Sequence, residues 1–482
     1  MAYLRGLRPG SHAAKIAAVR PDLSALRESF RGTVLSAFDP GYEPARVLFN
    51  TRIRTRPAVL CLCADTDDVV RAVRFARERH LPVAVRGGGH HASGLSLVDQ
   101  GLVIDVGGLR DIQLHGQEVT VGAGAGWRDI DKVTYVDVEF TGDDGLPSGY
   151  AVPGGECPTV SNAGYTLGGG YGLLGRRFGL GCDHLVEAEL VDAGGQVLRV
   201  DDEAHPDLMW ALRGAGAGGF GVVTRLRYRL NAVPKTVVGG FISWPFEQAE
   251  EVLQQYRDLY EDRDDDRLAL CLLLSTDPYP DGDKVISIYG LYVGAPAEAE
   301  KALAPVRSLG KPLVDTFGEL SYYELMEALG EEIPYGLQSR WRGGYFAPGG
   351  FDEAAFGTML EHFARIPSGY SMIRFDLLAG GAIARVPRDA TAFVHRDAVH
   401  YVSVVSLWQE DADTAANLAW ADDLADALRP HLTGEVYQNY ADRDLADWPS
   451  AYYGANYPRL QQVKRRYDPD DFFHHPQSVR LP

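Results

Sequence analysis

The sequence has no long apolar run and no excess of positive charge. None of its apolar segments approaches the roughly 20 residues that a membrane-spanning helix needs. Its 482 residues carry a formal net charge of −19, and a surface so acidic repels phosphate backbones and anionic lipids. We therefore expect neither a membrane nor a nucleic acid among its partners.

Cysteine is scarce, and no secretory leader is recognisable. The five cysteines are an odd, widely spaced set, unlike the disulfide framework of a small secreted protein. Cys61 and Cys63 share one face of an expected strand, and Cys271 lies in an apolar run, so these three should pack as small hydrophobic side chains. The N-terminus has no apolar stretch before a small-residue cleavage site. We expect a cytoplasmic protein, either a monomer or a homodimer.

Metal and dinucleotide motifs are missing or misplaced. The histidine pairs at 90–91 and 474–475 lack the spacing of a closed metal site, so we expect no metal. Residues 214–219, GAGAGG, fit the G-x-G-x-x-G pattern. They follow an expected helix and precede a strand, whereas a Rossmann turn follows a strand and opens a helix. The segment is either a backbone contact for a phosphate or ring, or a plain helix-to-strand turn.

The strand and helix patterns predict an α+β protein. Residues 55–106 read as strand, helix, strand, loop and strand, with Thr66 as the expected N-cap of the helix. Residues 184–200 read as a hairpin that turns at Gly194-Gly195. From about 236 to 433, apolar strands alternate with amphipathic helices, which is typical of a sheet covered by helices.

Glycine is concentrated in two places, and each place carries one nucleophile. VRGGGHHASG, residues 85–94, sets His90 and His91 behind three glycines. Residues 141–184 hold Cys157 within GGECPTVSNAGYTLGGGYG, an irregular stretch long enough to be functional. Imidazole and thiolate can both bond to an electrophilic cofactor. Either residue alone is more simply explained as a packed side chain, but two such loops together favour a cofactor.

Both stretches resemble the FAD-binding segments of the berberine bridge enzyme-like flavoproteins, in the vanillyl-alcohol oxidase superfamily. PDLMWALRGAGAGGFGVVT (206–224) and NYPRLQQVKRRYDPDDFFHHPQSV (456–479) are also similar to that family. In the middle third only GGAIARVPRDATAFVHR (380–396) is similar. The resemblance implies a two-domain, PCMH-type fold. Residues 1–233 and 434–482 would form the FAD-binding domain. Residues 234–433 would form an inserted substrate domain, an antiparallel sheet covered by helices.

The resemblance also implies FAD attached to the protein at two points. His90 would bond to the 8α-methyl group of the isoalloxazine and Cys157 to its C6, while the glycines before His90 let backbone amides meet the pyrophosphate. The small Val160 implies access of oxygen to the flavin. The full set expected beside the cofactor is Arg86, Gly87, Gly88, Gly89, His90, His91, Gly94, Cys157, Pro158, Thr159, Val160, Gly164, Gly168, Gly169, Gly170, Gly172, Gly219, Val222 and Asn439.

VYQNYADRD (436–444) resembles the family's Tyr-x-Asn-Tyr segment, which lies over the flavin. Tyr437 and Tyr440 are therefore candidate bases for a substrate hydroxyl. Free tyrosine has a pKa of about 10, so its phenolate must be stabilised by its neighbours. On a strand the two side chains would face opposite sides, so we expect one to act and prefer Tyr437. The residues expected to face the substrate are Tyr165 and, on expected strands that face the flavin, Asp376, Arg385 and Trp408.

We predict an FAD-dependent oxidase of a small molecule, with O₂ as electron acceptor and H₂O₂ as product. The substrate would be an alcohol, either a sugar hydroxyl or a polyketide-type antibiotic intermediate. A flavin dehydrogenase or oxidative cyclase acting on C–H or N–H substrates, and a non-catalytic flavin-fold binding protein, are the alternatives. Three departures from the family pattern leave the substrate open: Gly219 for an asparagine, Ala92 for a tyrosine, and Tyr165 for a histidine of the plant enzymes.

Overall fold

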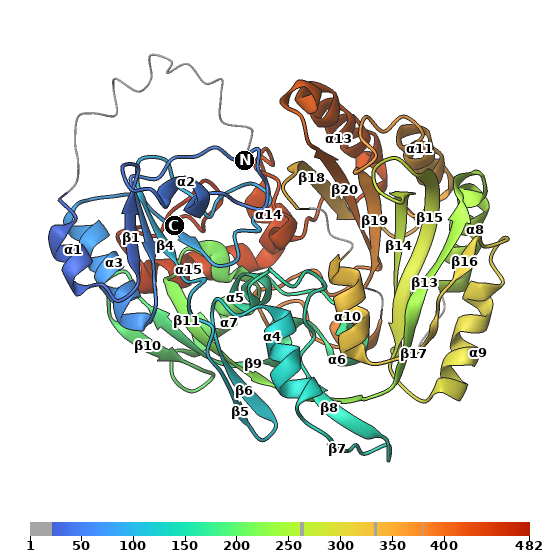
Figure 1. Cartoon of the computed structure of the whole chain (residues 1–482), viewed down its shortest axis with the longest axis horizontal. Helices are drawn as coiled ribbons and strands as arrows, with labels where there is room; N and C mark the ends of the chain where they lie inside the picture. Colours follow the sequence, from blue (N-terminus) through green and yellow to red (C-terminus); the bar gives the residue numbers. More distant parts are fainter. Residues whose placement is uncertain (1–21, 261–264, 332–334, 379) are drawn as a thin grey trace.

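The computed structural model describes residues 22–260, 265–331, 335–378 and 380–482, which form two layered parts (Figure 1). One part holds three small sheets, and the other holds one large sheet with helices against it. The expected α+β class with a large antiparallel sheet is confirmed, whereas the boundaries at 233 and 434 stay a prediction. In the described ranges, no helix has both the length and the apolar character needed to cross a membrane.

A four-stranded sheet carries the first glycine-rich loop. Its strands lie in the order β1 (Thr33–Ser36), β2 (Val59–Leu62), β4 (Leu102–Asp105) and β3 (Val83–Arg86). Helix α3 (Thr66–Glu78) connects β2 with β3. Asp65, not the expected Thr66, caps this helix by accepting a hydrogen bond from the N–H of Asp68. The glycine loop begins where β3 ends.

Two further sheets flank the second glycine-rich stretch. The five-stranded sheet has the order β10 (Val197–Val200), β9 (Leu185–Val191), β11 (Val222–Arg229), β6 (Glu118–Gly122) and β5 (Ile112–His115). The three-stranded sheet has the order β12 (Asn231–Pro234), β8 (Pro147–Ala151) and β7 (Phe140–Thr141). The expected hairpin is confirmed as β9–β10. Between β8 and β9 the chain forms only short helices, so this stretch is mostly loop.

The large sheet is antiparallel and has eight strands. Its path is β16 (Val314–Asp315), β13 (Val237–Pro245), β15 (Asp283–Tyr292), β14 (Leu268–Asp277), β19 (Met372–Leu377), β20 (His400–Trp408) and β18 (Gln338–Tyr345), and β17 (Gly318–Leu320) also pairs with β13. Alternate side chains of each strand face opposite sides of a sheet. Phe375 and Val404 therefore face a helix-covered core, while Asp376 and Tyr401 face the other way.

Helices cover one face of this sheet, as Figure 1 shows, and share a core with its strands. They are α8 (Ala249–Tyr260), α9 (Pro296–Arg307), α11 (Glu353–Phe363) and α13 (Thr414–Leu428). Leu424 of α13 and Met359 of α11 are fully buried in the same core as Val404. Cys61, Cys63 and Cys271 are buried and unpaired, as expected.

The C-terminal segment returns to the part with the small sheets. Helices α14 (Trp448–Tyr453) and α15 (Tyr457–Tyr467) lie among the N-terminal elements in Figure 1. The buried Lys464 of α15 donates hydrogen bonds to the carbonyl oxygens of Gly219 and Phe473, at 2.8 and 2.7 Å. The other α-helices are α1 (Ser24–Ser29), α2 (Tyr42–Ala45), α4 (Trp127–Asp131), α5 (Asn162–Leu167), α6 (Gly175–Phe178), α7 (Pro206–Ala215), α10 (Tyr322–Glu331) and α12 (Gly381–Ala384).

Candidate active site

The two glycine-rich loops lie directly against each other. A Cβ at Gly87 would lie 2.2 Å from Ser161 Oγ, and a Cβ at Gly88 would lie 2.4 Å from the carbonyl oxygen of Thr159. Any larger residue would push the loops apart. These two glycines are therefore required by the approach of the loops, which brings His90 next to Cys157.

The first loop also offers free backbone donors. None of the N–H groups of residues 87–90 donates a hydrogen bond to a residue in the described part of the chain. A run of unpaired backbone N–H groups is a binding site for an anion. The loop therefore fits the pyrophosphate of FAD, in line with the role expected for Gly87–Gly89.

Four side chains, which we call the nucleophile cluster, gather where the loops meet: His90, Cys157, Thr159 and Tyr335. The hydroxyl of Thr159 is central, because its Oγ1 lies 2.8 Å from His90 Nε2 and 3.5 Å from Cys157 Sγ. Tyr335 Oη lies 3.0 Å from the same Oγ1 and 3.7 Å from the sulfur. The expected pair of nucleophiles is thus joined by one hydroxyl group.

Both histidines of the first loop are neutral at pH 7. Burial lowers the pKa of His90 to about 4, and its ring stacks on Phe49 with the centroids 4.4 Å apart. Burial also lowers the pKa of His91 to about 4, helped by the neighbouring His475. His91 Nδ1 accepts a hydrogen bond from the N–H of Ser93 at 3.2 Å, so this residue stabilises the turn of the loop.

Tyr437 and Tyr440 lie in a second group, the tyrosine cluster, with Tyr171, Tyr345 and Tyr401. The expected strand is wrong, because residues 438–440 form a 3-10 turn in which the N–H of Tyr440 donates to the carbonyl of Tyr437. The turn brings both rings together, edge to face, with centroids 5.0 Å apart. Tyr171 stacks on Tyr437 at 4.1 Å, and its hydroxyl bonds to that of Tyr345.

The hydroxyl oxygen of Tyr437 accepts two hydrogen bonds from N–H donors. The N–H of Gly170 donates at 2.9 Å and Asn439 Nδ2 at 2.8 Å. Burial raises the pKa of Tyr437, and these two donors oppose the rise because they favour the phenolate. In contrast, the hydroxyl of Tyr440 makes no hydrogen bond to the residues that the structure describes.

A charged group of two carboxylates and one guanidinium borders the tyrosine cluster and consists of Glu156, Asp376 and Arg374. Arg374 donates to both carboxylate oxygens of Glu156, at 2.8 and 3.1 Å, and to Asp376 Oδ1 at 2.7 and 2.9 Å. The other oxygen of Asp376, Oδ2, is buried and has no partner among the described residues. Burial raises the pKa of Asp376, although Arg374 opposes this. One oxygen is left to bind a donor.

Three residues expected at the substrate lie elsewhere or are already bonded. Arg385 follows α12 rather than lying on a strand, and it is exposed and paired with Asp266. Trp408 lies on the helix-covered face of β20, where its indole N–H donates to Thr414. The hydroxyl of Tyr165 donates to backbone carbonyls, including that of Tyr171. Tyr165 and Asp376 both reach the tyrosine cluster, but of the two only Asp376 has a polar atom there without a partner among the described residues.

The other expected cofactor residues lie along the two loops and near the returning C-terminal segment. Arg86 forms a buried ion pair with Asp105 beneath the glycine loop. Val160 is half-buried, and its N–H donates to the carbonyl of Cys157 at 3.2 Å. The glycines Gly168, Gly169 and Gly170 border Asn439, Phe393 and Tyr165, respectively, and Gly172 abuts Gly154. Gly94 abuts Ile53, Pro158 abuts Gly330, and Gly164 lies near Ser161. Gly219 follows the 3-10 helix Gly216–Gly218, and Val222 begins β11.

Six residues of these clusters were not predicted: Glu156, Tyr171, Tyr335, Tyr345, Arg374 and Tyr401. Arg374 could have been found from the two-residue period of β19, which places it on the same face as Asp376. Glu156 and Tyr171 lie inside the stretch that carries Cys157. Tyr335 carries no sequence signal.

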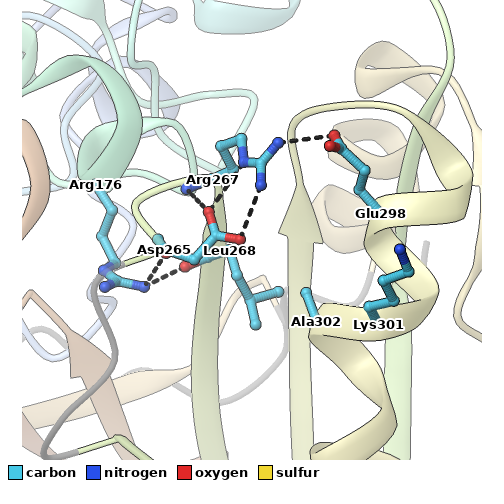
Figure 2. Close-up of a pocket in the computed structure, with 7 residues that line it drawn as sticks. All are labelled: Arg176, Asp265, Arg267, Leu268, Glu298, Lys301 and Ala302. Carbon is cyan, nitrogen blue, oxygen red and sulfur yellow. Dashed lines mark hydrogen bonds and ion pairs between the residues drawn. The ribbon is translucent and has the colours of Figure 1, made fainter.

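A separate cavity of about 380 Å³ lies beside α9 and the start of β14 (Figure 2). Its charged groups bond mainly to one another or to the backbone. Arg267 pairs with Asp265 at 3.0 Å and with Glu298 at 2.8 Å, and Arg176 donates to the carbonyl of Asp265. No member of the nucleophile or tyrosine cluster lines this cavity. We therefore do not assign the substrate to it.

Comparison with known proteins gives two family models and several similar proteins. The model for an FAD binding domain matches residues 57–201, and the model described as berberine and berberine like matches residues 436–480. The FAD-linked oxidoreductase YgaK of Bacillus subtilis is 31% identical, with 93% of this chain and 96% of that protein covered.

Two further relatives and a solved structure are similar along most of the chain. The (R)-6-hydroxynicotine oxidase of Paenarthrobacter nicotinovorans is 28% identical, with 94% of this chain and 97% of that protein covered. Aclacinomycin-N/aclacinomycin-A oxidase of Streptomyces galilaeus is 29% identical, with 90% and 87% covered. The structure of BBE-like 1 from Physcomitrella patens is 25% identical and has a TM-score of 0.85, with 96% of this chain and 100% of that chain covered.

Proposed function

This chain belongs to the berberine bridge enzyme-like family of FAD-linked oxidoreductases, and on that premise we propose that it is an oxidase that holds FAD by two covalent bonds and oxidises a small-molecule alcohol. Bound FAD would supply the acceptor for a hydride from the substrate carbon and the route of two electrons to O₂, with H₂O₂ as product. The observation that carries the proposal is the meeting of His90 and Cys157 at the hydroxyl of Thr159.

The geometry of the nucleophile cluster supports attachment at two points. The 8α-methyl group and C6 belong to the same ring of the isoalloxazine, so residues bonded to both must lie close together. His90 and Cys157 satisfy this condition, since one hydroxyl touches both. The low pKa of His90 leaves one ring nitrogen with a free electron pair at neutral pH. The free N–H groups of residues 87–90 would hold the pyrophosphate.

We assign the base to Tyr437. Its Oη would take the proton of the substrate hydroxyl, and the N–H donors of Gly170 and Asn439 would stabilise the phenolate before that transfer. Tyr440 lacks these donors, and its hydroxyl is available for a hydrogen bond to the substrate. Both tyrosines thus contribute, in different ways, although only one of them removes the proton.

The charge of the site bears on the class of substrate. Glu156 and Asp376 place two carboxylates beside the single guanidinium of Arg374, so an acidic substrate would be repelled. The unpartnered Asp376 Oδ2 can accept a hydrogen bond from a hydroxyl group, which suits a sugar or a polyketide-type alcohol. The similarity to aclacinomycin oxidase supports such a substrate.

The same charges also support an alternative class of substrate. A surplus of buried negative charge also suits a protonated amine, and (R)-6-hydroxynicotine oxidase is a relative of similar identity. Flavin reduction by matched alcohols and amines separates the two classes of substrate.

The proposal that O₂ is the electron acceptor depends on Val160, which lies on the loop of Cys157. A small valine here goes with access of oxygen in this family, and Val160→Leu should therefore slow reoxidation by O₂ while leaving flavin reduction unchanged. Stopped-flow absorbance at the flavin band measures both steps. Reduction that yields no H₂O₂ in the wild type would show a dehydrogenase instead.

Acid precipitation tests the attachment directly. We expect the yellow flavin to stay with the denatured chain, and His90→Ala and Cys157→Ala each to leave one bond. If the native chain releases all of its flavin, the two-point attachment is wrong. A flavin that no compound of a broad panel bleaches without oxygen would support a non-catalytic binding protein.

A further inference from the structure

The nucleophile cluster contains an unbroken series of polar contacts from the histidine to the cysteine. His90 Nε2 lies 2.8 Å from Thr159 Oγ1, which lies 3.0 Å from Tyr335 Oη, which lies 3.7 Å from Cys157 Sγ. The two hydroxyl groups between the nucleophiles each carry one proton that can donate in only one direction. All hydrogen bonds of the series therefore point the same way, and the ring nitrogen that carries the imidazole proton decides which way.

Only one direction leaves both nucleophiles ready to react. If Nε2 carries the proton, it donates to Thr159 Oγ1, and Nδ1 keeps its electron pair. Thr159 can then donate to Tyr335 Oη, and Tyr335 can donate to the sulfur of Cys157. In the opposite direction Thr159 donates to Nε2, the proton lies on Nδ1, and this nitrogen cannot attack.

We propose that Thr159 and Tyr335 are positioning residues that prepare His90 Nδ1 and Cys157 Sγ for bonding to FAD, an inference that rests on the proposed two-point attachment. Thr159 fixes the tautomer and the rotation of the imidazole. Tyr335 fixes the hydroxyl of Thr159 and the direction of the sulfur. Phe49, stacked on His90 and in edge contact with Tyr335 at 5.4 Å, holds both rings in place.

The attachment chemistry balances as follows. At each site the flavin carbon loses one hydrogen as a proton, and the nucleophile loses its own proton. The nucleophile supplies the electron pair of the new N–C or S–C bond, so each attachment leaves the flavin reduced by two electrons. O₂, the acceptor of the proposed oxidase, takes up these electrons with two protons and leaves as H₂O₂. The proton that His90 releases from Nε2 passes to Thr159 Oγ1 as Thr159 passes its own proton to Tyr335 Oη, and the half-exposed Tyr335 hydroxyl releases its proton to solvent.

The position of Tyr335 has a consequence for assembly. His90, Cys157 and Thr159 come from the two glycine-rich loops, whereas Tyr335 precedes β18 of the large sheet. Its side chain is about half exposed, so few other contacts fix it. The hydrogen-bond series is complete only when both parts of the chain are folded against each other. Attachment of FAD should therefore follow, and report, the docking of the large sheet.

The test measures attachment itself rather than turnover. Full-length chains from riboflavin-limited cells are incubated with FAD in air, quenched in acid and digested, and mass spectrometry counts flavin on His90, on Cys157 or on both. The variants are Thr159→Val, Thr159→Ser and Tyr335→Phe. Tyr150→Phe, which removes a hydroxyl from the β7–β8 hairpin, is the control. Melting temperatures are measured on every variant.

We expect Thr159→Val to slow both attachments by about tenfold or more, because a displaced nucleophile loses its near-attack geometry. Thr159→Ser should restore the wild-type rate, and Tyr335→Phe should slow the Cys157 bond more than the His90 bond. NMR of the imidazole should show bonding through Nδ1 in the wild type and a share of Nε2 in Thr159→Val.

Three results would overturn the inference. Thr159→Val could attach FAD at the wild-type rate and only through Nδ1. Thr159→Ser could be as slow as Thr159→Val, which would show that the hydroxyl is not the cause. A wild-type chain without any covalent flavin would instead refute the two-point attachment, and this inference with it.

Discussion

In the proposed function the nucleophile cluster and the tyrosine cluster have different chemical tasks, and their surroundings differ. Thr159 and Tyr335 are exposed and neutral, whereas Tyr437 is 2% exposed and lies near a buried ion pair. A nucleophile that reacts once needs the correct orientation and the correct tautomer. A base that acts in every catalytic cycle needs a stabilised charge where water is excluded. Orientation comes from hydroxyl groups, and charge stabilisation comes from buried N–H donors.

The two clusters are joined through the backbone at Glu156 and Cys157. Glu156 pairs with Arg374 of β19, and the next residue carries the sulfur. A change in the large sheet can therefore reach the loop of Cys157 by way of the ion pair between Arg374 and Glu156. Variants that change the side chains of one cluster and leave the other cluster unchanged test how far the two are independent.

The largest effect should come from Tyr437→Phe. Removing the proposed base should slow flavin reduction by about 10²–10⁴-fold, because no other group accepts the substrate proton with the same stabilisation. The covalent flavin content should stay at the wild-type level. Anaerobic stopped-flow with an alcohol that reduces the wild-type flavin measures the rate. Tyr453→Phe, another buried tyrosine, is the control, and an equal loss in both variants would contradict the assignment.

Arg374→Met should break the link between the clusters and destabilise the protein by about 3 kcal/mol, because it leaves two carboxylates without their partner. The control is Arg365→Met, whose exposed pair with Glu361 should contribute less than about 0.5 kcal/mol. Denaturant unfolding of the flavin-loaded proteins measures both. If Arg374→Met and Arg365→Met lower the free energy of unfolding by similar amounts, the buried pair contributes little net stability.

The meeting of His90 and Cys157 at Thr159 agrees with the sequence prediction that places both at one site, while their role as nucleophiles stays a prediction. His90 and Cys157 each follow or interrupt a glycine-rich loop, and that combination is rare enough to be informative. The face of the sheet on which a strand residue lies was harder to predict from the sequence. A strand read one residue out of phase places every side chain on the wrong face, which is how Trp408 was expected at the substrate. Arg385 was misplaced because α12 interrupts the strand pattern.

Long-range contacts account for most of what the sequence could not show. Tyr335 and Thr159 are 176 residues apart, and nothing in either segment indicates the other. The 3-10 turn at 438–440 was missed because alternation within VYQNY also fits a strand. In that turn Tyr437 and Tyr440 share one cluster, so the choice between them rests on their hydrogen bonds rather than on opposite faces.

Asn439→Leu should change the pH dependence of the tyrosine cluster alone. Burial raises the pKa of Tyr437, and the Asn439 donor opposes the rise, so losing that donor raises the pKa further. The rate of flavin reduction increases with pH as the base ionises, and this increase should move to higher pH by about 1–2 units. Reduction rates measured across pH detect the shift. An unmoved profile in a fully flavinylated variant would exclude Tyr437 as the titrating group.

The smallest effect should come from His91→Asn, which tests the neutral state of the loop histidines. The folded pKa of His91, about 4, lies below the ordinary value of about 6.5. The unfolded chain therefore binds more protons between these two pH values. Stability is complete above pH 6.5 and is lost as the pH falls toward 4. An asparagine oxygen can still accept the hydrogen bond from the N–H of Ser93, but it does not titrate.

The variant and the wild type should therefore have equal stability at pH 7.5. At pH 5 the variant should be more stable by about 1 kcal/mol, after allowance for the partial exposure of the ring. Thermal unfolding of the flavin-loaded proteins at both pH values measures the difference. If the difference in stability between the variant and the wild type is the same at pH 5 and at pH 7.5, His91 is not held neutral. The nucleophile cluster would then tolerate charge at its border, and its contrast with the tyrosine cluster would rest on the hydroxyl groups alone.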